Sequence, residues 1–482
     1  MHYLPATAVL TPFVFALLLG FCRHWREKSW QAGAFLGVLL TFALSLTMLA
    51  FLDGAPVAAG QSYLAFPLTF SFRADSLSVF LAVLFSFCYL LATIYSFGYL
   101  AHSHARRRYF VLLLLTEGAL LGVLMSASLM GLFLFFELLA VLSYLLVIHE
   151  EDSKAMLAGA KYLYMTIGAG LAIFYGLVVT YYLAGRTDFV AGGYLAASPL
   201  AASGLFAFLL GFGIKAGMFP LHIWLPDAYS AAPAPVSAIL SGCLAKMGAY
   251  GLIRVIYDVY GPEVVLAVSF DTVLLCLAVA TIFFGSALAL QQDELKRRLA
   301  YSSVAQIGYV LLGIALLSER ALFGALFHIF SHALMKGTLF LCAGAIITQT
   351  GKKNISELAG LGRQMPLVMG AFTLAALSMV GLPPFNAFIS KWNLALASLE
   401  GGLPLLVGVL IISSLLNALY YFPIVISAFF ASPAPQAPVS AGILPAGMLW
   451  TTVLMALLCV SFAFLQPYWP GLLVGRIAAA LF

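Results

Sequence analysis

Five lysines lie within long apolar stretches of this 482-residue chain: Lys161, Lys215, Lys246, Lys336 and Lys391. A lysine that faces lipid at the centre of a membrane span costs roughly 2.5–3.5 kcal/mol, so the five together would cost on the order of 12–17 kcal/mol. We therefore expect these side chains to face a protein interior. The alternative for Lys161 and Lys336 is a place near a helix end, from which the amine reaches the membrane surface. A buried amine that releases and regains a proton is suited to a proton relay.

A break in the apolar pattern follows Lys215. Gly217 and Pro220 interrupt helical hydrogen bonding, and water can enter a membrane helix at such a point. Glu137 lies in the middle of the apolar run FFELLAVLSYLL (135–146). A lone carboxyl group there would be protonated, whereas a carboxylate that faces Lys215 can stay ionised. We expect the two side chains to pair, and opening of the pair would act as a gate.

Two histidines and a lysine recur at a spacing of four in the segment LFHIFSHALMKGTLF (326–340). This spacing places His328, His332 and Lys336 on one helix face. An imidazole titrates near neutral pH and can accept a proton on one nitrogen while it donates from the other, so the pattern favours a file of proton carriers. Metal binding by the histidine pair is the alternative, but no third ligand is near in sequence, and no metal site is predicted.

Lys246 and Lys391 complete the candidate set. The neighbours of Lys246 are small, which permits close helix approach and water between helices. Lys391 follows a second Gly/Pro break by about two helical turns in GLPPFNAFISKW (381–392), and so mirrors Lys215. Glu117 also lies in an apolar run, and the pattern assigns it no role.

These residues need a scaffold that crosses the membrane. The chain is 63% hydrophobic and 9% charged, whereas a soluble domain is about 25% charged. Its mean hydropathy is +1.06. The apolar runs are about 20 to 30 residues long, which suits helices and excludes the short alternating segments of a membrane barrel. The sequence predicts an all-α membrane protein, and its net charge of +5 is attributed to membrane topology and not to a nucleic-acid partner.

Polar and Gly/Pro interruptions divide the chain into about fourteen candidate membrane spans, with bounds that are soft by several residues. The spans are 4–22, 30–52, 75–100, 109–127, 128–149, 156–184, 203–223, 233–257, 262–290, 298–317, 320–348, 366–398, 403–431 and 442–465.

Lysine and arginine residues in the connections predict the orientation of these spans. One face collects the larger set: Arg23, Arg26, Lys28, Arg106, Arg107, Arg108, Lys154, Lys296, Arg297, Arg298, Lys352, Lys353 and Arg363. The other face has the smaller set: Arg73, Arg186, Arg254, Arg320 and Arg476. Because positive residues favour the cytoplasmic side, we expect both termini on the outer side of the inner (cytoplasmic) membrane. The first apolar run has no basic segment before it and no cleavage site after it, so we expect a retained span and not a signal peptide.

A faint internal repeat relates the two halves of the chain. The segment 155–170 resembles the segment 321–337 when Ala160 is aligned with Ala325, an offset of 165 residues. The same offset brings the two Gly/Pro breaks near register, and an odd number of spans per unit inverts one unit relative to the other. Paired broken helices in inverted repeats indicate an ion site at the membrane midplane. Chance alignment is the alternative, since Gly and Pro are frequent in membrane helices. The predicted units are three N-terminal helices (1–108), two inverted five-helix repeats (109–257 and 262–431) and a C-terminal helix (442–482).

The cysteines are scattered singly, with no CxxC motif and no Cys/His ligand spacing. They are Cys22, Cys88, Cys243, Cys276, Cys342 and Cys459. We expect them to be small core residues, and we expect no metal, haem, iron–sulfur cluster or other cofactor.

Eight segments, in order, resemble motifs of one family: the antiporter-like subunits shared by respiratory complex I, group 4 membrane-bound hydrogenases and Mrp-type multisubunit Na+/H+ antiporters. The segments are RADSLSVF (73–80), YSFGYL (95–100), LFLFFELLAVLSYLL (132–146), GAKYL (159–163), IKAGMFPLHIWLPDAYSAAPAPVSA (214–238), LKRRLAYSSVAQIGY (295–309), SHALMKGTLF (331–340) and GLPPFNAFISKW (381–392). The resemblance covers essentially the whole chain.

The resemblance implies a role for each matching ionisable residue along a proton path. Glu137 and Lys215 correspond to a coupling ion pair, Lys246 to the central proton carrier, His328 and His332 to a bridging relay, and Lys391 to the residue that faces the exit half-channel.

Three features indicate which subunits of this family the chain resembles most. The distal subunit of complex I has a long lateral helix after its last spans, whereas this chain stops at Phe482, so we do not expect it to be that subunit. The second break carries Lys391, as in the antiporter D subunit, its hydrogenase counterpart and one complex I paralogue, while another paralogue has glutamate. The stretch WLPDAYSAAPAP (224–235) is most similar to the antiporter and hydrogenase types.

The expected function is therefore that of a proton-translocating subunit of an Mrp-type antiporter or a membrane-bound hydrogenase, with other membrane subunits as partners and no redox centre of its own. It would be part of an enzyme only as the pumping subunit of an oxidoreductase. One alternative is an M- or N-like subunit of a complex I-type NADH:quinone oxidoreductase. Another is a membrane scaffold in which the lysines form buried ion pairs without transport. The sequence leaves open whether H+ or Na+ is carried.

Overall fold

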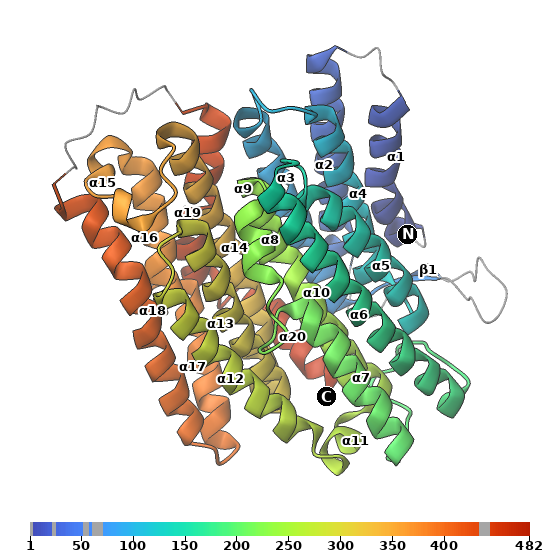
Figure 1. Ribbon diagram of the computed structural model, residues 1–482. Helices are drawn as coiled ribbons and strands as arrows, with labels where there is room; N and C mark the ends of the chain where they lie inside the picture. The colour runs from blue at the N-terminus through green and yellow to red at the C-terminus, as the bar shows by residue number, and fades with distance from the viewer. Residues whose placement is uncertain (1–2, 22–25, 52–56, 60–70, 433–443) are drawn as a thin grey trace.

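The computed structural model describes residues 3–21, 26–51, 57–59, 71–432 and 444–482. Cys22 and Arg23, which the sequence assigned to the core and to the inner face, lie outside these ranges. Within them the chain is a bundle of long helices that lie side by side with a common tilt (Figure 1).

The N-terminal part contains three helices and a small antiparallel hairpin, which the sequence did not predict. They are α1 (Leu4–Phe21), α2 (Glu27–Ala50), β1 (Val57–Ala59), β2 (Phe72–Ala74) and α3 (Ser76–Tyr99).

The next elements form the first half of the bundle, and two π-helical segments, η1 and η2, extend one of its helices. The elements are α4 (Arg106–Met125), α5 (Leu129–Val147), α6 (Ser153–Ala184), α7 (Pro199–Ala216), α8 (Leu225–Ala231), α9 (Ala234–Ile239), η1 (Leu240–Leu244), α10 (Ala245–Ile253) and η2 (Arg254–Tyr260).

The second half ends with a short helix that follows the last long one. Its elements are α11 (Pro262–Ala267), α12 (Phe270–Leu290), α13 (Leu295–Ala315), α14 (Glu319–Thr350), the 3-10 turn η3 (Ile355–Glu357), α15 (Leu361–Gln364), α16 (Pro366–Val380), α17 (Asn386–Glu400), α18 (Leu405–Phe430), α19 (Ala446–Leu465) and α20 (Gly471–Leu481).

Twelve helices within the described ranges are long and apolar enough to cross a membrane. The segment α9 to η2 counts as one of them, because it runs without interruption from Ala234 to Tyr260. Two predicted spans are not in this set: α13, which begins with three basic residues, and the pair α16 and α17, which a break divides. The membrane-protein fold class is confirmed, while the number fourteen, the four predicted units and the inverted repeats remain predictions.

Both expected helix breaks are present. Helix α7 ends at Gly217 with φ 78°, and α16 ends at Gly381 with φ 88°. Glycine adopts this left-handed conformation without a steric penalty, so it terminates a helix where other residues would be strained.

Helix α14 is the centre of the bundle. The apolar window that identifies it as a span is fully buried, whereas the corresponding windows of α18 and α19 are 33% buried. Large apolar side chains are exposed on such outer helices, which is expected of a surface in contact with lipid. Most of the polar side chains discussed below are buried inside the bundle, including those on helices that also expose an apolar face.

Three expectations from the sequence are wrong. Arg254 does not lie in an outer connection, because the helix continues to Tyr260 and Arg254 is buried between the carboxylates of Asp75 and Asp258, at 2.6 and 2.7 Å. Lys296 is also buried and donates to two carbonyl oxygens at the C-terminal end of α8, where the helix dipole favours a cation. Cys276 is exposed on α12, unlike the other described cysteines.

Candidate functional site

Glu137 of α5 and Lys215 of α7 lie next to each other, as expected. The distance from Lys215 Nζ to Glu137 Oε1 is 3.6 Å, and the side chains are 6% and 35% exposed, respectively. The amine also lies over the ring of Phe136, 5.2 Å from its centroid. On α6, Gly170 leaves the space that the carboxylate fills, since a Cβ atom there would be 2.6 Å from Glu137 Oε1. Residues of three helices, α5, α6 and α7, thus determine the position of this ion pair.

The break after Lys215 opens a small space toward the next helix. Lys215 lies in the last turn of α7, where backbone carbonyl groups lack helical partners. The indole of Trp224 donates to one of them, the Ile214 oxygen, at 2.8 Å. A cavity of about 20 Å³ lies here and is lined by Lys215, Trp224 and Ala245, among others. Since a single water needs roughly 10–15 Å³, this cavity is large enough for one.

Lys246 lies directly after the π-helical turn η1. A π turn displaces the regular hydrogen bonds, and such turns are frequent at functional sites. The Lys246 amine donates to the backbone oxygen of Ser241 in this turn. Two glycines bring the neighbouring helices close: a Cβ atom on Gly248 would be 2.5 Å from the backbone of α7, and one on Gly242 would be 3.3 Å from that of α14. Lys246 is thus between the break at Lys215 and the histidine helix.

The two histidines of α14 are fully buried and have different surroundings. The His328 ring is hydrogen-bonded through both nitrogens, to Ser390 Oγ at 2.8 Å and to Gln306 Oε1 at 3.1 Å. The His332 ring lies 6.1 Å from it, centroid to centroid, and neither of its nitrogens is bonded to a described residue. Lys246 is within electrostatic range of both rings. His332 is therefore the side chain in this group that is free to exchange partners.

Lys336 is buried and does not reach the membrane surface. Its amine donates to the Leu299 carbonyl at 2.8 Å, to the Tyr421 hydroxyl at 3.1 Å and to the Ser302 hydroxyl. These groups belong to α13 and α18. Of the three groups predicted to form a file, the two histidine rings lie next to each other, whereas the Lys336 amine turns toward these neighbouring helices.

Lys391 of α17 caps the broken end of α16. Its amine donates to the carbonyl oxygens of Met379 and Val380, at 3.1 and 2.9 Å, and to Ser414 Oγ at 3.1 Å. A cation at a helix C-terminus is favoured by the exposed carbonyl groups. Gly381 permits this approach, because a Cβ atom there would be 2.7 Å from Lys391 Cδ.

Sequence reasoning missed the uncharged polar residues that connect His328 with Lys391. Gln306 donates to Asn417 Oδ1 at 3.4 Å, and Asn417 donates to the Met379 carbonyl at 3.3 Å, which Lys391 also contacts. His328 is joined to the same group through Gln306 Oε1, at 3.1 Å, and its other ring nitrogen bonds Ser390, the neighbour of Lys391 in sequence. One feature of the sequence could have identified Gln306 and Asn417: each is an amide side chain inside an apolar helix, where its polar atoms need hydrogen-bond partners.

Lys161 is separate from this group. It forms an ion pair with Asp227 at 2.7 Å, and Asp227 also pairs with Arg297 at 2.9 Å. The Lys161 side chain is 40% exposed, so its charge is partly solvated and is compensated by a carboxylate. Lys161 lies in the first third of α6. This position is compatible with the alternative stated above, in which Lys161 is near a helix end.

Glu117 is fully buried in α4, and neither of its carboxyl oxygens is hydrogen-bonded to a described residue. The Tyr89 hydroxyl, also unbonded, is within electrostatic range of it. Cys243, three residues before Lys246, is within the same range. Glu117 is thus close to the helix that carries Cys243 and Lys246, but it is bonded to none of the polar groups of that helix.

Several buried polar atoms in this interior form no hydrogen bond with a described residue, although Lys215 and Glu137 attract each other at 3.6 Å. They include Glu137 Oε1, Lys215 Nζ and both ring nitrogens of His332. Buried polar groups are almost always satisfied by protein or by water, so these atoms indicate positions for exchangeable water and protons. Within the described ranges, no group of three or more His, Cys, Asp or Glu side chains could hold a metal ion. The arrangement is suited to proton transfer along α5, α7, α10, α14 and α17.

The fold is shared with solved membrane complexes. A chain in the structure of the Mrp complex from Dietzia sp. DQ12-45-1b aligns with a TM-score of 0.89 at 22% identity, over 99% of this chain and 97% of that chain. A chain of respiratory complex I from Thermus thermophilus aligns with a TM-score of 0.85 at 24% identity, over 99% of this chain and 98% of that one. These likenesses show the fold.

Curated relatives belong to the same three kinds of complex. NADH-quinone oxidoreductase subunit N of Desulforudis audaxviator is 40% identical over 78% of this chain and 78% of that protein. Na(+)/H(+) antiporter subunit A1 of Staphylococcus haemolyticus is 31% identical over 98% of this chain and 61% of that protein. Hydrogenase-4 component B of Escherichia coli is 29% identical over 85% of this chain and 64% of that protein.

Two family models match the chain. Residues 62–110 match the model described as NADH-Ubiquinone oxidoreductase (complex I), chain 5 N-terminus. Residues 126–417, more than half of the chain, match the model described as NADH:quinone oxidoreductase/Mrp antiporter, TM. The chain is therefore a multi-pass integral membrane protein that belongs to the NADH:quinone oxidoreductase/Mrp antiporter family of antiporter-like subunits.

Proposed function

We propose that this chain carries protons through its interior as the ion-translocating subunit of a larger membrane complex. The observation that supports this most is the set of buried or half-buried ionisable side chains on α5, α7, α10, α14 and α17, from Glu137 and Lys215 through Lys246 to Lys391. A structural set of charges would be fully paired, because unpaired buried charges are costly. Here, among the described residues, Lys215 Nζ forms no hydrogen bond and faces Glu137 at 3.6 Å, and both nitrogens of His332 lack a hydrogen-bond partner.

The proposed path begins at the Glu137–Lys215 pair. At 3.6 Å the two groups attract each other but do not share a close hydrogen bond, so a small movement of either one separates them. In this proposal a proton released from Lys215 crosses the cavity that Lys215 and Ala245 line and reaches Lys246, the neighbour of Ala245 in sequence. The unbonded His332 accepts the proton from Lys246, and His328 passes it on toward Lys391, on the side where Gln306 and Asn417 connect His328 with the carbonyl group that Lys391 contacts.

Substitution of the central lysine tests this proposal. Lys246→Met should abolish proton uptake by the assembled complex in liposomes, because the side chain can no longer carry a proton. Lys246→Arg should not restore it, since guanidinium keeps its proton below about pH 12. Lys353→Met is the matched control, since Lys353 is an exposed lysine of the α14–α16 connection. Normal transport by an intact Lys246→Met complex would refute the proposal and leave a scaffold role.

A second question is which type of membrane complex contains this chain. Relatedness at 40% identity to a protein called NADH-quinone oxidoreductase subunit N favours a complex I-type assembly over the Mrp-type or hydrogenase assembly that the motifs suggested. Purification of the native complex distinguishes them: flavin and iron–sulfur proteins would copurify with a complex I-type subunit, and only membrane subunits with an antiporter. We propose other membrane subunits as partners in either case, with both termini on the outer side. Replacing Na+ by K+ in the transport assay would show whether Na+ is also carried.

A further inference from the structure

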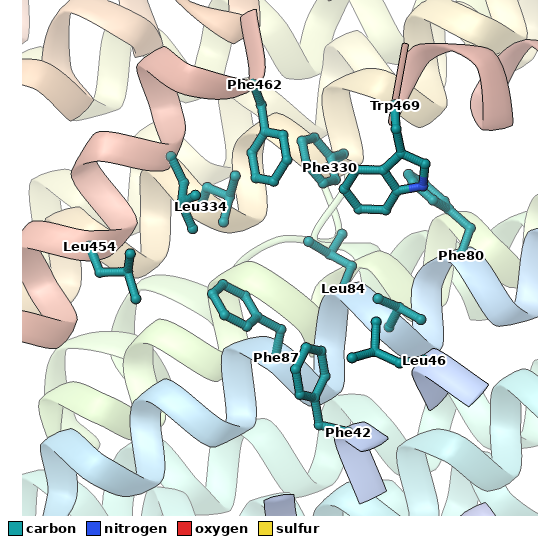
Figure 2. A pocket seen from close by; sticks show the side chains of 12 residues that line it. Phe42, Leu46, Phe80, Leu84, Phe87, Phe330, Leu334, Leu454, Phe462 and Trp469 are labelled. Carbon is teal, nitrogen blue, oxygen red and sulfur yellow. The ribbon is translucent and has the colours of Figure 1, made fainter. Parts of the chain in front are cut away.

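An apolar cavity of about 300 Å³ lies between α2, α3, α14 and α19, outside the site described above. Figure 2 shows its lining side chains, which surround a central space. Every lining residue is aliphatic or aromatic: Phe42, Leu46, Phe80, Val83, Leu84, Phe87, Phe330, Leu334, Leu454, Leu458, Phe462 and Trp469. Such a lining gives water no hydrogen-bond partners, so water is not the expected occupant.

The cavity leads from the lipid-facing surface to the central helix. Leu46 and Leu454 lie at its rim and are 41% and 42% exposed. Phe80, Phe330 and Leu334 form its inner wall and are buried. The space is half open and only about 300 Å³ in volume, whereas a helix with its side chains is about 10–12 Å in diameter and would not enter. A narrow flexible chain from the bilayer would.

A basic residue lies near one end of the cavity. Trp469, at the end of the lining, precedes α20 by two residues. Helix α20 buries Val474, Ile477 and Ala478 and leaves Arg476 exposed, as in helices that lie in the membrane interface. Arg476 forms no ion pair with any residue in the described ranges. Arg476 is about 7–8 Å along the helix axis from Gly471, by the rise of 1.5 Å per residue, so it follows the Trp469 end of the cavity along the chain.

We propose that this cavity binds one acyl chain of a phospholipid, and that Arg476 binds the anionic headgroup of the same lipid. A hydrocarbon chain matches the apolar lining, and a negative headgroup matches the unpaired guanidinium. The inner wall includes Phe330 and Leu334, which lie two residues to either side of His332. The bound chain therefore adds packing behind the histidine helix, beside the contacts that α14 makes with α3 and α19.

Photolabelling of the intact complex tests this site. The complex is placed in nanodiscs with phosphatidylglycerol that carries a diazirine in the middle of its acyl chain, then washed in detergent, irradiated and mapped by mass spectrometry. Label on Leu84 and Phe330 should survive the wash, whereas label on Ile411 and Leu415 of α18, which are 64% and 61% exposed and face bulk lipid, should be lost. Equal loss at both places would overturn the proposal.

Two further comparisons test the binding of the acyl chain and the binding of the headgroup separately. Leu454→Trp should close the mouth and abolish the retained label, while Leu457→Trp, at another exposed position of α19 outside the lining, should not. Arg476→Gln should lower the retained label about fivefold for phosphatidylglycerol, the ratio expected for one basic residue at an anionic surface, and should have no effect for phosphatidylcholine. Unchanged label in Leu454→Trp, or in Arg476→Gln with phosphatidylglycerol, would refute the site as stated. A cross-link from this cavity to a partner subunit in place of lipid would also overturn it.

Discussion

The Glu137 carboxylate is placed beside Lys215 by a missing side chain on α6. Gly170 faces the carboxylate, and a Cβ atom there would be 2.6 Å from Oε1 and 2.7 Å from Oε2. The carboxylate is the mobile end of a flexible side chain, so Gly170→Ala should move it away from Lys215 without disturbing the helices. We expect a several-fold loss of proton transport with normal assembly. Gly168→Ala, where a Cβ atom meets nothing within 4 Å, is the control and should transport normally. Equal transport by both variants would show that the pair is not needed.

Glu117 gives a prediction about stability. Burying a carboxyl group without a hydrogen-bond partner costs about 1–3 kcal/mol on the scale of protein mutations. Both Glu117 oxygens are buried and unbonded to described residues, so Glu117→Leu should remove this cost and raise the thermal unfolding temperature of the purified protein. Ser96→Ala is a useful contrast, because it breaks a buried 3.0 Å contact with the Tyr109 hydroxyl and should lower that temperature. A lower temperature for Glu117→Leu would mean that Glu117 has a partner.

The sequence identified the charged members of the site because a charge inside an apolar run is rare. It did not identify Gln306, Ser390 and Asn417, since an uncharged polar residue in a membrane helix often bonds only its own backbone. Ser86 does so, donating to the Ala82 carbonyl, whereas Ser390 also contacts His328. Residue type and position do not distinguish these two serines, and only the packing of α14 against α17 does.

At the scale of elements, the second break depends on Gly381. Its φ of 88° would strain an L-residue by roughly 1–2 kcal/mol, and a Cβ atom would also collide with Lys391 Cδ. Gly381→Ala should therefore lower stability by at least about this amount and displace the Lys391 amine from the end of α16, with loss of transport. Gly370→Ala, in the same helix with nothing within 4 Å of the added atom, should be neutral or slightly stabilising, because alanine is the better helix former. Thermal unfolding and proton uptake of the two variants give the comparison.

The connection between α5 and α6 predicts a pH dependence. Burial, reinforced by the nearby charge of Arg108, lowers the pKa of His149 to about 4, from about 6.5 in an unfolded chain. Between these values the unfolded state binds a proton that the folded state does not, so stability is fully present above pH 6.5 and falls as the pH decreases toward 4. His149→Leu should flatten the unfolding temperature over this range. His102→Leu, at an exposed position on a neighbouring connection, should leave the slope unchanged, and an unchanged slope in His149→Leu would contradict the assignment.

Hydropathy predicted most of the long helices, because a span of lipid requires a continuous apolar segment. Hydropathy failed where a residue distant in sequence pairs with a charged side chain and so lowers the free-energy cost of burying it. Arg254 was assigned to an outer connection at the end of the predicted span 233–257, yet it is buried within a helix that continues to Tyr260, where Asp75, from the start of α3, neutralises it at 2.6 Å. The hairpin of β1 and β2 was also missed, since three-residue strands are too short to produce a periodic pattern.

At the scale of the whole molecule, the two breaks should serve opposite membrane faces. Helix α7 precedes its break and carries Lys215 in its last turn, whereas Lys391 lies on α17, after the second break. If the halves are inverted, as the repeat predicts, Lys215 is open to the inner face and Lys391 to the outer face. Both side chains are now almost fully buried, at 6% and 7% exposure, so access depends on water in each half and not on surface position.

Cysteine accessibility measures this directly. In a cysteine-free background, Lys391→Cys should react with a membrane-impermeant thiol reagent from outside at least tenfold faster than Lys215→Cys, and the order should reverse from inside. The ratio is expected because, in an inverted arrangement, each break would give water a route from one face and the helices around Lys246 would separate the two routes. A cysteine at Ser331, which is fully buried on α14, should react from neither face and sets the background. Equal rates for positions 215 and 391 from one face would mean that both breaks open to the same side, and the inverted arrangement would then be wrong.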